Sequence, residues 1–117
     1  MATTTTRRPT CVWRGASGNE YTFEVFRLPA DIASGQDGNY IYAKVNAEGS
    51  WVPVYIGQGD LGERSGPGHH KAACIRAKGA THFHCHLNPD ELKRLAEERD
   101  LLAYHWEAYE PLGCNEL

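Results

Sequence analysis

Residues 38–64 read GNYIYAKVNAEGSWVPVYIGQGDLGER, and this stretch decides the fold expected for the chain. Residues 40–45 and 51–56 are rich in β-branched and aromatic side chains, which favours two strands. The turn between them contains Gly49, so the two strands are expected to form a hairpin. Pro53 cannot donate a ladder hydrogen bond, which favours an edge or strand-start position.

Two further strands are predicted outside the hairpin. Residues 20–28 alternate between two faces, and residues 81–87 also look like a strand. Residues 69–78 could form a short helix that ends at Gly79, a glycine placed as the residue after the C-cap.

A long helix is predicted from Asn88 onward, because Asn88 is a good N-cap, Pro89 suits the first turn and Glu91 completes a capping pattern. Apolar residues then recur at helical spacing and predict one face packed on the sheet. They are Leu92, Leu95, Ala96, Leu102, Ala103 and Trp106. The expected fold class is α+β, with a small three-stranded, mainly antiparallel sheet flanked by helices and an extra N-terminal strand.

The 117-residue length suits one domain, expected over residues 19–117, with residues 1–18 as a frayed N-terminal segment. No apolar run approaches the roughly 20 residues of a membrane span. No apolar export signal is seen, so a cytoplasmic location with four reduced cysteines is expected.

The charges are unevenly spread, although the net charge is only −3. That net charge argues against a protein that coats nucleic acid by bulk charge. Residues 65–89 contain no Asp or Glu but hold Lys71, Arg76, Lys78 and five of the six histidines. This basic segment could face a phosphate, or it could pair with the acidic helix that follows.

The order of several polar and aromatic residues resembles the GIY-YIG nuclease superfamily over residues 38–115. The most specific part is the segment YIGQGDLGER, which starts at Tyr55. The residues that carry the resemblance are Tyr40, Tyr55, Gly57, Arg64, His69 or His70, Glu98 and Asn115.

The resemblance implies a metal-dependent endonuclease that hydrolyses phosphodiester bonds in DNA or a related nucleic acid. It implies that Glu98 binds one Mg²⁺ or Mn²⁺ ion and that Arg64 stabilises developing negative charge. Tyr40 would be the general base or the group that orients the water. The other implied roles are assistance by Tyr55 and His69 or His70, and structural support of the site by Gly57 and Asn115.

Helical geometry favours Glu98 over Glu97 as the metal ligand. Glu98 is three residues after Leu95 and four before Leu102, so it should flank the buried stripe, whereas Glu97 should point toward solvent.

Two alternatives stay open. One is a catalytically inactive binding or adaptor module of the same fold, with a protein partner or a homodimer supplying target selection. The other is a zinc site formed by His82, His84 and His86, which share one face of the predicted strand. Their spacing of roughly 6.5–7 Å along a strand is long for chelation by three in a row.

Overall fold

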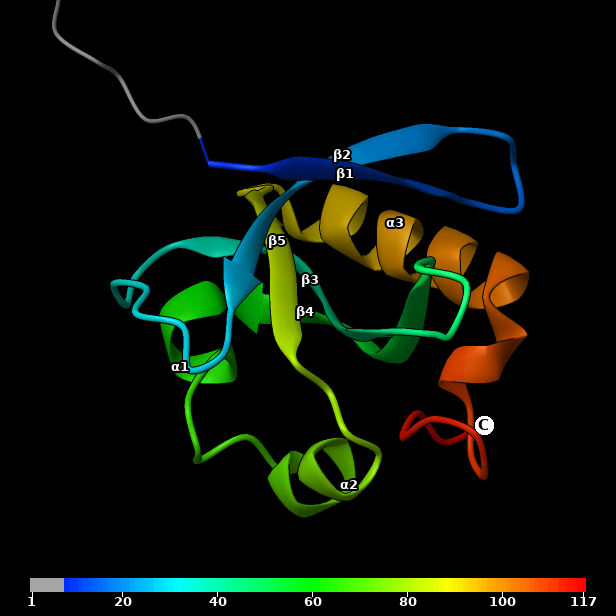
Figure 1. The fold of residues 1–117 in the computed structure, drawn as a ribbon. Coiled ribbons are helices and arrows are strands. Elements are labelled where there is room, and N and C mark those ends of the chain that lie inside the picture. The colour runs from blue at the N-terminus through cyan, green and yellow to red at the C-terminus, as the bar shows by residue number, and fades with distance from the viewer. Residues whose placement is uncertain (1–7) are drawn as a thin grey trace, which may run out of the picture.

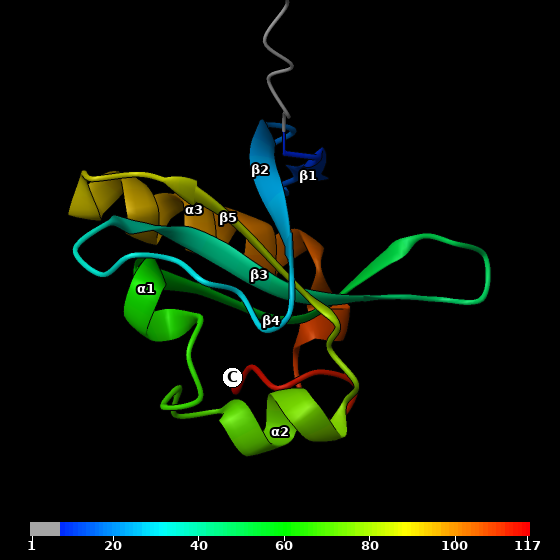
Figure 2. The same cartoon turned by 60° about the vertical axis from the view of Figure 1, so that its left-hand side comes forward.

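The computed structural model describes residues 8–117 and contains one five-stranded antiparallel sheet flanked by helices. Figures 1 and 2 show that the sheet is strongly curled and that the helices lie on both sides of it. The elements in chain order are β1 (Thr10–Arg14), β2 (Glu20–Arg27), β3 (Asp37–Val45), β4 (Trp51–Asp60), α1 (Leu61–Arg64), α2 (Ala72–Ala77), β5 (His82–Leu87), α3 (Glu91–Tyr104) and the 3-10 helix η1 (Trp106–Ala108).

The sheet has the strand order β1-β2-β5-β3-β4, so the expected three-stranded sheet is wrong. Strand β5 lies between β2 and β3, which joins the N-terminal hairpin to the hairpin of β3 and β4 in one continuous sheet. The strand expected as an extra is therefore integral to the sheet. The strand that contains Pro53 is β4, which lies at the sheet edge as its proline predicts.

The N-terminal segment differs from the expected frayed end. Residues 10–14 form β1, which pairs with β2 in a register that places Trp13 opposite Tyr21. Trp13 is buried, so its apolar surface stabilises this hairpin against the rest of the fold. Residues 1–7 lie outside the described part of the chain.

Two apolar clusters cover opposite faces of the sheet. One cluster joins Tyr40, Tyr42 and Phe83 of the sheet with Leu61 of α1 and Ile75 of α2. The other joins Ile41 and Ile56 with Leu101 of α3 and Ala108 of η1. Successive residues of β3 therefore point into different clusters, as the two-residue period of a strand requires.

Helix α3 buries a different face from the one that its leucines predicted. Leu92 is 77% exposed and Trp106 is 68% exposed, whereas Arg94, Glu97 and Leu101 are buried. The helix also begins later than expected. Its N-cap is Asp90 in place of Asn88, and the Asp90 side chain accepts a hydrogen bond from the backbone N–H of Lys93.

Polar partners explain why charged residues of α3 face the sheet. The Arg94 guanidinium donates hydrogen bonds to Gln58 Oε1 at 2.9 Å and to the Asn88 carbonyl at 3.0 Å. Glu97 Oε2 lies 2.6 Å from His86 Nε2. The Glu97 carboxylate is therefore buried, and the prediction that it points toward solvent is wrong. Buried charged groups are tolerated when such partners satisfy them.

Helix α2 is shorter than the predicted helix over residues 69–78. Gly79 follows its C-cap with φ of +82°, a left-handed conformation that glycine adopts without steric cost. Within residues 8–117, no helix has both the length and the apolar character required to cross a membrane.

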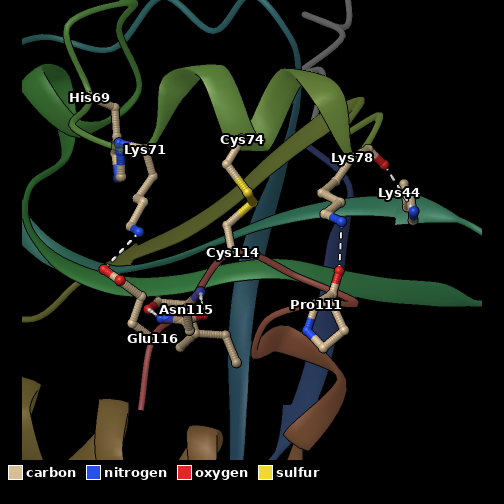
Figure 3. Close-up of a disulfide and its surroundings, with 10 residues drawn as sticks. Lys44, His69, Lys71, Cys74, Lys78, Pro111, Cys114, Asn115 and Glu116 are labelled. Carbon is tan, nitrogen blue, oxygen red and sulfur yellow. Dashed lines mark hydrogen bonds and ion pairs between the residues drawn. A yellow bond between two sulfur atoms is a disulfide. The ribbon is translucent and has the colours of Figure 1, made fainter.

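The cysteines are not all reduced, contrary to the expectation. Cys74 of α2 and Cys114 near the C-terminus form a disulfide, while Cys11 and Cys85 are free thiols. Figure 3 shows this bond joining α2 to the C-terminal segment.

Candidate active site

A β-bulge in β4 decides where Tyr55 points. Tyr42 pairs with Tyr55, and the next residue of β3, Ala43, pairs with Pro53, so Val54 is an extra residue in the strand. A bulge of this kind re-aims the neighbouring side chains. Tyr55 consequently lies on the same face as Tyr42, and its ring centroid is 6.1 Å from that of Tyr40.

Gly57 and Gly59 leave room on the same face of β4. Gly57 lies opposite Tyr40, and a Cβ atom added at Gly57 would lie 2.5 Å from the Tyr40 hydroxyl oxygen. A Cβ atom added at Gly59 would lie 2.8 Å from Arg64 Nε. The structural role expected for Gly57 therefore has a steric reason, because Tyr40 occupies the space that a larger residue would need.

Tyr40 reaches His69, which lies just before α2. The Tyr40 hydroxyl oxygen is 2.7 Å from His69 Nε2, and the backbone N–H of Lys71 donates to His69 Nδ1 at 2.9 Å. Burial, followed by the charges of His70 and Arg64, lowers the pKa of His69 to about 4, so the imidazole is neutral at pH 7. Because Nδ1 accepts a hydrogen bond, the single ring proton is on Nε2 and is donated to Tyr40.

Tyr55 and His70 form a second, more exposed pair beside the first. The Tyr55 hydroxyl oxygen lies 3.3 Å from His70 Nε2, and the His69 and His70 rings stack with centroids 4.6 Å apart. Each of the two histidines therefore contacts a different tyrosine.

Arg64 is positioned by the short helix α1. The Asp60 side chain caps this helix by accepting from the backbone N–H of Glu63, and it also accepts from Gly35 at 2.6 Å. The Tyr42 hydroxyl donates to the Arg64 carbonyl at 2.5 Å, which fixes the other end of α1.

Glu98 lies on α3, which covers the face of the sheet opposite Tyr40 and Tyr55. Burial raises the pKa of both tyrosines; smaller effects come from Glu98, which raises both pKa values, and from Arg64, which lowers them. Burial raises the pKa of the Glu98 carboxyl above its usual value, while Arg64 and Arg99 act against this effect. None of the ion pairs found within residues 8–117 involves Glu98.

Asn115 holds the outer edge of β4 in place. Its side chain accepts a hydrogen bond from the Ile56 N–H and donates one to the Ile56 carbonyl, both at 2.9 Å. Asn115 is 7% exposed, so this pair of bonds is shielded from water. Ile56 lies between Tyr55 and Gly57, and Asn115 therefore fixes the backbone that carries both.

The three histidines of β5 differ in their hydrogen-bond partners. Trp13 Nε1 donates to His84 Nδ1 at 2.9 Å, and the His86 ring bonds to Glu97. Trp51 packs against both His82 and His84, with ring centroids 4.8 and 4.5 Å apart. Within residues 8–117, no group of three or more His, Cys, Asp or Glu residues is arranged to hold a metal ion. The alternative zinc site finds no geometric support.

His84 should make folding stability depend on pH. It is fully buried, and burial lowers its pKa to about 4 from the ordinary 6.5. The unfolded chain binds a proton between these two values and the folded chain does not, so stability is complete above pH 6.5 and falls toward pH 4. We expect the free energy of unfolding to fall by about 3 kcal/mol because of this group, as measured by urea unfolding at each pH.

The change in unfolding free energy with pH should be smaller in His84→Gln, whereas the exposed control His70→Gln should keep the wild-type change. An equal change with pH in wild type and His84→Gln would contradict the prediction.

The structure also adds residues that sequence spacing did not identify. Lys71 fixes the His69 tautomer through its backbone, and its Nζ lies 2.8 Å from Glu116 Oε2. Cys74 and Cys114 tie the same two segments together. No sequence signal indicates the Lys71–Glu116 and Cys74–Cys114 pairings, because each joins positions 40 or more residues apart.

Comparison with known proteins adds no relative. A scan against protein-family models, a search of curated proteins and a search of solved structures all find no match for this chain.

Proposed function

We propose that this protein is a metal-dependent endonuclease of the GIY-YIG type, which hydrolyses phosphodiester bonds in DNA or a related nucleic acid. The observation that carries the proposal is the contact of two tyrosines with two histidines on one face of the sheet. The Tyr40 hydroxyl lies 2.7 Å from His69 Nε2, the Tyr55 hydroxyl lies 3.3 Å from His70 Nε2, and the two tyrosine rings stack with centroids 6.1 Å apart. Arg64 lies against Gly59 of the strand that carries Tyr55. Polar and titratable groups gathered in this way are typical of functional sites. Glu98 enters the proposal through the sequence resemblance.

Glu98 fits the role of the metal ligand. Its carboxylate is partly buried and free of the ion pairs seen elsewhere within residues 8–117. Mg²⁺ and Mn²⁺ prefer oxygen ligands, and Mg²⁺ often binds one or two carboxylates plus water and substrate phosphate. When bound, the ion would supply Lewis-acid stabilisation of charge on the phosphate oxygens.

Tyr40 is best suited to orienting the attacking water. Burial, reinforced by Tyr55, raises its pKa above the usual range, so the side chain is a neutral phenol at pH 7. Its oxygen accepts the N–H of His69, which leaves its own hydroxyl proton and one lone pair for a water molecule. His69 acts through Tyr40 and is therefore a positioning residue.

Arg64 is suited to stabilising the charge that develops on the phosphate. Its guanidinium offers donors in a planar fork that matches phosphate oxygens. Gly59 lies beside Arg64 Nε and gives the guanidinium room at the edge of β4. Tyr55 and His70 lie within hydrogen-bond distance of each other and are suited to contacting the substrate backbone.

The expected partner is nucleic acid, with the basic segment around α2 as its contact surface. Arg76 on α2 is exposed, Lys78 at its C-cap is partly buried, and no Asp or Glu occurs between residues 65 and 89. A protein partner or a homodimer for target selection and a cytoplasmic location stay predictions.

The test is nicking of supercoiled and branched DNA in Mg²⁺ or Mn²⁺, with a chelator as the blank. We expect metal-dependent nicking by the wild type and a loss of about 10²–10³-fold in Arg64→Ala, because one charge-stabilising group is removed. The control is Arg27→Ala on β2, which should keep full activity.

Two results would count against the proposal. Wild-type protein that binds nucleic acid in the presence of metal without cleaving it would instead support the binding-module alternative. Cleavage that survives in Arg64→Ala would show that the assigned site does not catalyse the reaction.

A further inference from the structure

The C-terminal segment, residues 109–117, lies along the edge of β4, the strand that carries Tyr55. The Cys114 N–H donates to the Val54 carbonyl at 2.8 Å, and the Asn115 side chain binds both backbone groups of Ile56. These bonds take the place of a further strand along the edge of β4. The segment therefore determines the position of the β4 backbone from which Tyr55 projects.

The same C-terminal segment is attached to α2. The disulfide joins Cys114 to Cys74, and Lys71 Nζ lies 2.8 Å from Glu116 Oε2. Lys78 Nζ donates to the Pro111 carbonyl at 2.5 Å. Figure 3 shows these three links in a row along the helix, with His69 beyond its start.

Helix α2 has few other means of attachment. It contains six residues, of which only Ile75 is buried, and it has no side-chain N-cap. A helix this short is not stable by itself in water. His69 precedes α2, and the N–H of Lys71 at the α2 N-cap position sets its tautomer, so a shift of α2 would change the hydrogen bond from His69 to Tyr40.

We propose that the Cys74–Cys114 disulfide is a redox-sensitive clamp that regulates the active site. In the oxidised state the clamp holds Asn115 against the Ile56 backbone and His69 against the Tyr40 hydroxyl. Reduction releases α2 and the C-terminal segment from each other and lowers activity. The effect on cleavage rests on the proposed nuclease function, whereas the structural change does not.

The chemistry requires a dithiol reductant. Its thiolate attacks the sulfur of Cys74, which is partly exposed, and Cys114 leaves as a thiolate that takes up a proton. The second thiol of the reductant then displaces Cys74 and closes the reductant's own disulfide. Two electrons and two protons reach the protein, and the reductant is oxidised. In the cytoplasm, the location expected for this chain, disulfides are usually transient and catalytic or redox-sensing.

The experiment compares the oxidised wild type with the same protein reduced by dithiothreitol. The first readout is amide hydrogen exchange at Ile56, and the second is the imidazole NMR signal of His69. We expect reduction to speed Ile56 exchange at least about tenfold and to shift the His69 signal, with both effects reversed by oxidised glutathione. Nicking activity should fall in parallel and recover with them.

Two variants sharpen the test. Cys74→Ser should resemble the reduced protein and ignore dithiothreitol, while Cys11→Ser, which removes a free thiol on β1, should behave like the wild type. If Cys74→Ser fails to fold, reversible reduction of the wild type still decides the matter.

The outcomes separate the clamp from the nuclease function. Unchanged Ile56 exchange and an unchanged His69 signal after reduction would overturn the clamp. Equal cleavage in both redox states would overturn its regulatory role. Exchange that responds to reduction in a protein that never cleaves DNA would support the clamp and refute the nuclease function.

Discussion

Glu98→Gln is expected to abolish metal-dependent cleavage, with a loss of at least about 10³-fold. The substitution keeps the size of the side chain but removes the charge that a divalent cation requires, and such an ion supplies several kcal/mol of transition-state stabilisation. Mn²⁺ binding measured by calorimetry in the presence of an uncleavable DNA should be lost together with activity.

The control for Glu98→Gln lies on the same helix. Glu91 is exposed in the first turn of α3, and Glu91→Gln should leave both metal binding and cleavage unchanged. Because burial raises the pKa of Glu98, wild-type metal binding should weaken as pH falls through that raised value. Full cleavage by Glu98→Gln would remove Glu98 from the site.

Tyr40→Phe is expected to lower the cleavage rate by about 10²–10⁴-fold while the fold is kept. The ring is fully buried and stacks on Phe83 with centroids 5.2 Å apart, so phenylalanine preserves the packing. Only the hydroxyl that accepts from His69 is lost. Single-turnover cleavage at saturating DNA measures the rate of the hydrolysis step separately from the affinity for DNA.

A hydroxyl elsewhere in the molecule provides the comparison for Tyr40→Phe. The Tyr21 hydroxyl on β2 donates to Asp100 at 2.7 Å, and β5 separates β2 from the strand that carries Tyr40, so Tyr21→Phe should cut at the wild-type rate. If Tyr40→Phe also cuts at that rate, the hydroxyl has no part in the chemistry and the tyrosine is only a core residue.

The sequence predicted the strands better than it predicted the helix faces. The hairpin of β3 and β4 follows from local β-branched and aromatic composition, and Pro53 indicated the sheet edge. The leucine spacing of α3 indicated the wrong face, because Arg94 and Glu97 are buried through bonds to Gln58 and His86. Hydrophobic periodicity does not reveal a buried polar side chain whose desolvation cost is offset by a hydrogen-bond partner far away in the sequence.

The structure joins some of the candidate site residues: Tyr40 contacts His69, and Tyr55 contacts His70. Glu98 lies on the helix that covers the other face of the sheet, so its role stays a prediction. The reasons for the observed contacts are not visible in the sequence. The bulge at Val54 aims Tyr55, and the Lys71 backbone selects the His69 tautomer. Such details depend on strand register and on hydrogen bonds that exist only once the sheet has formed.

Elements with a local cause followed from the sequence: the central hairpin, its turn at Gly49 and the helix end at Gly79. Tertiary packing set the five-stranded sheet, the buried face of α3, the room that Gly57 and Gly59 leave for Tyr40 and Arg64, and the contact of the C-terminal segment with β4. Asn115 meets Ile56 across 59 residues and Cys74 meets Cys114 across 40. Contacts at such separations arise when the whole chain packs, because only global burial repays the entropy of closing the long loops between them.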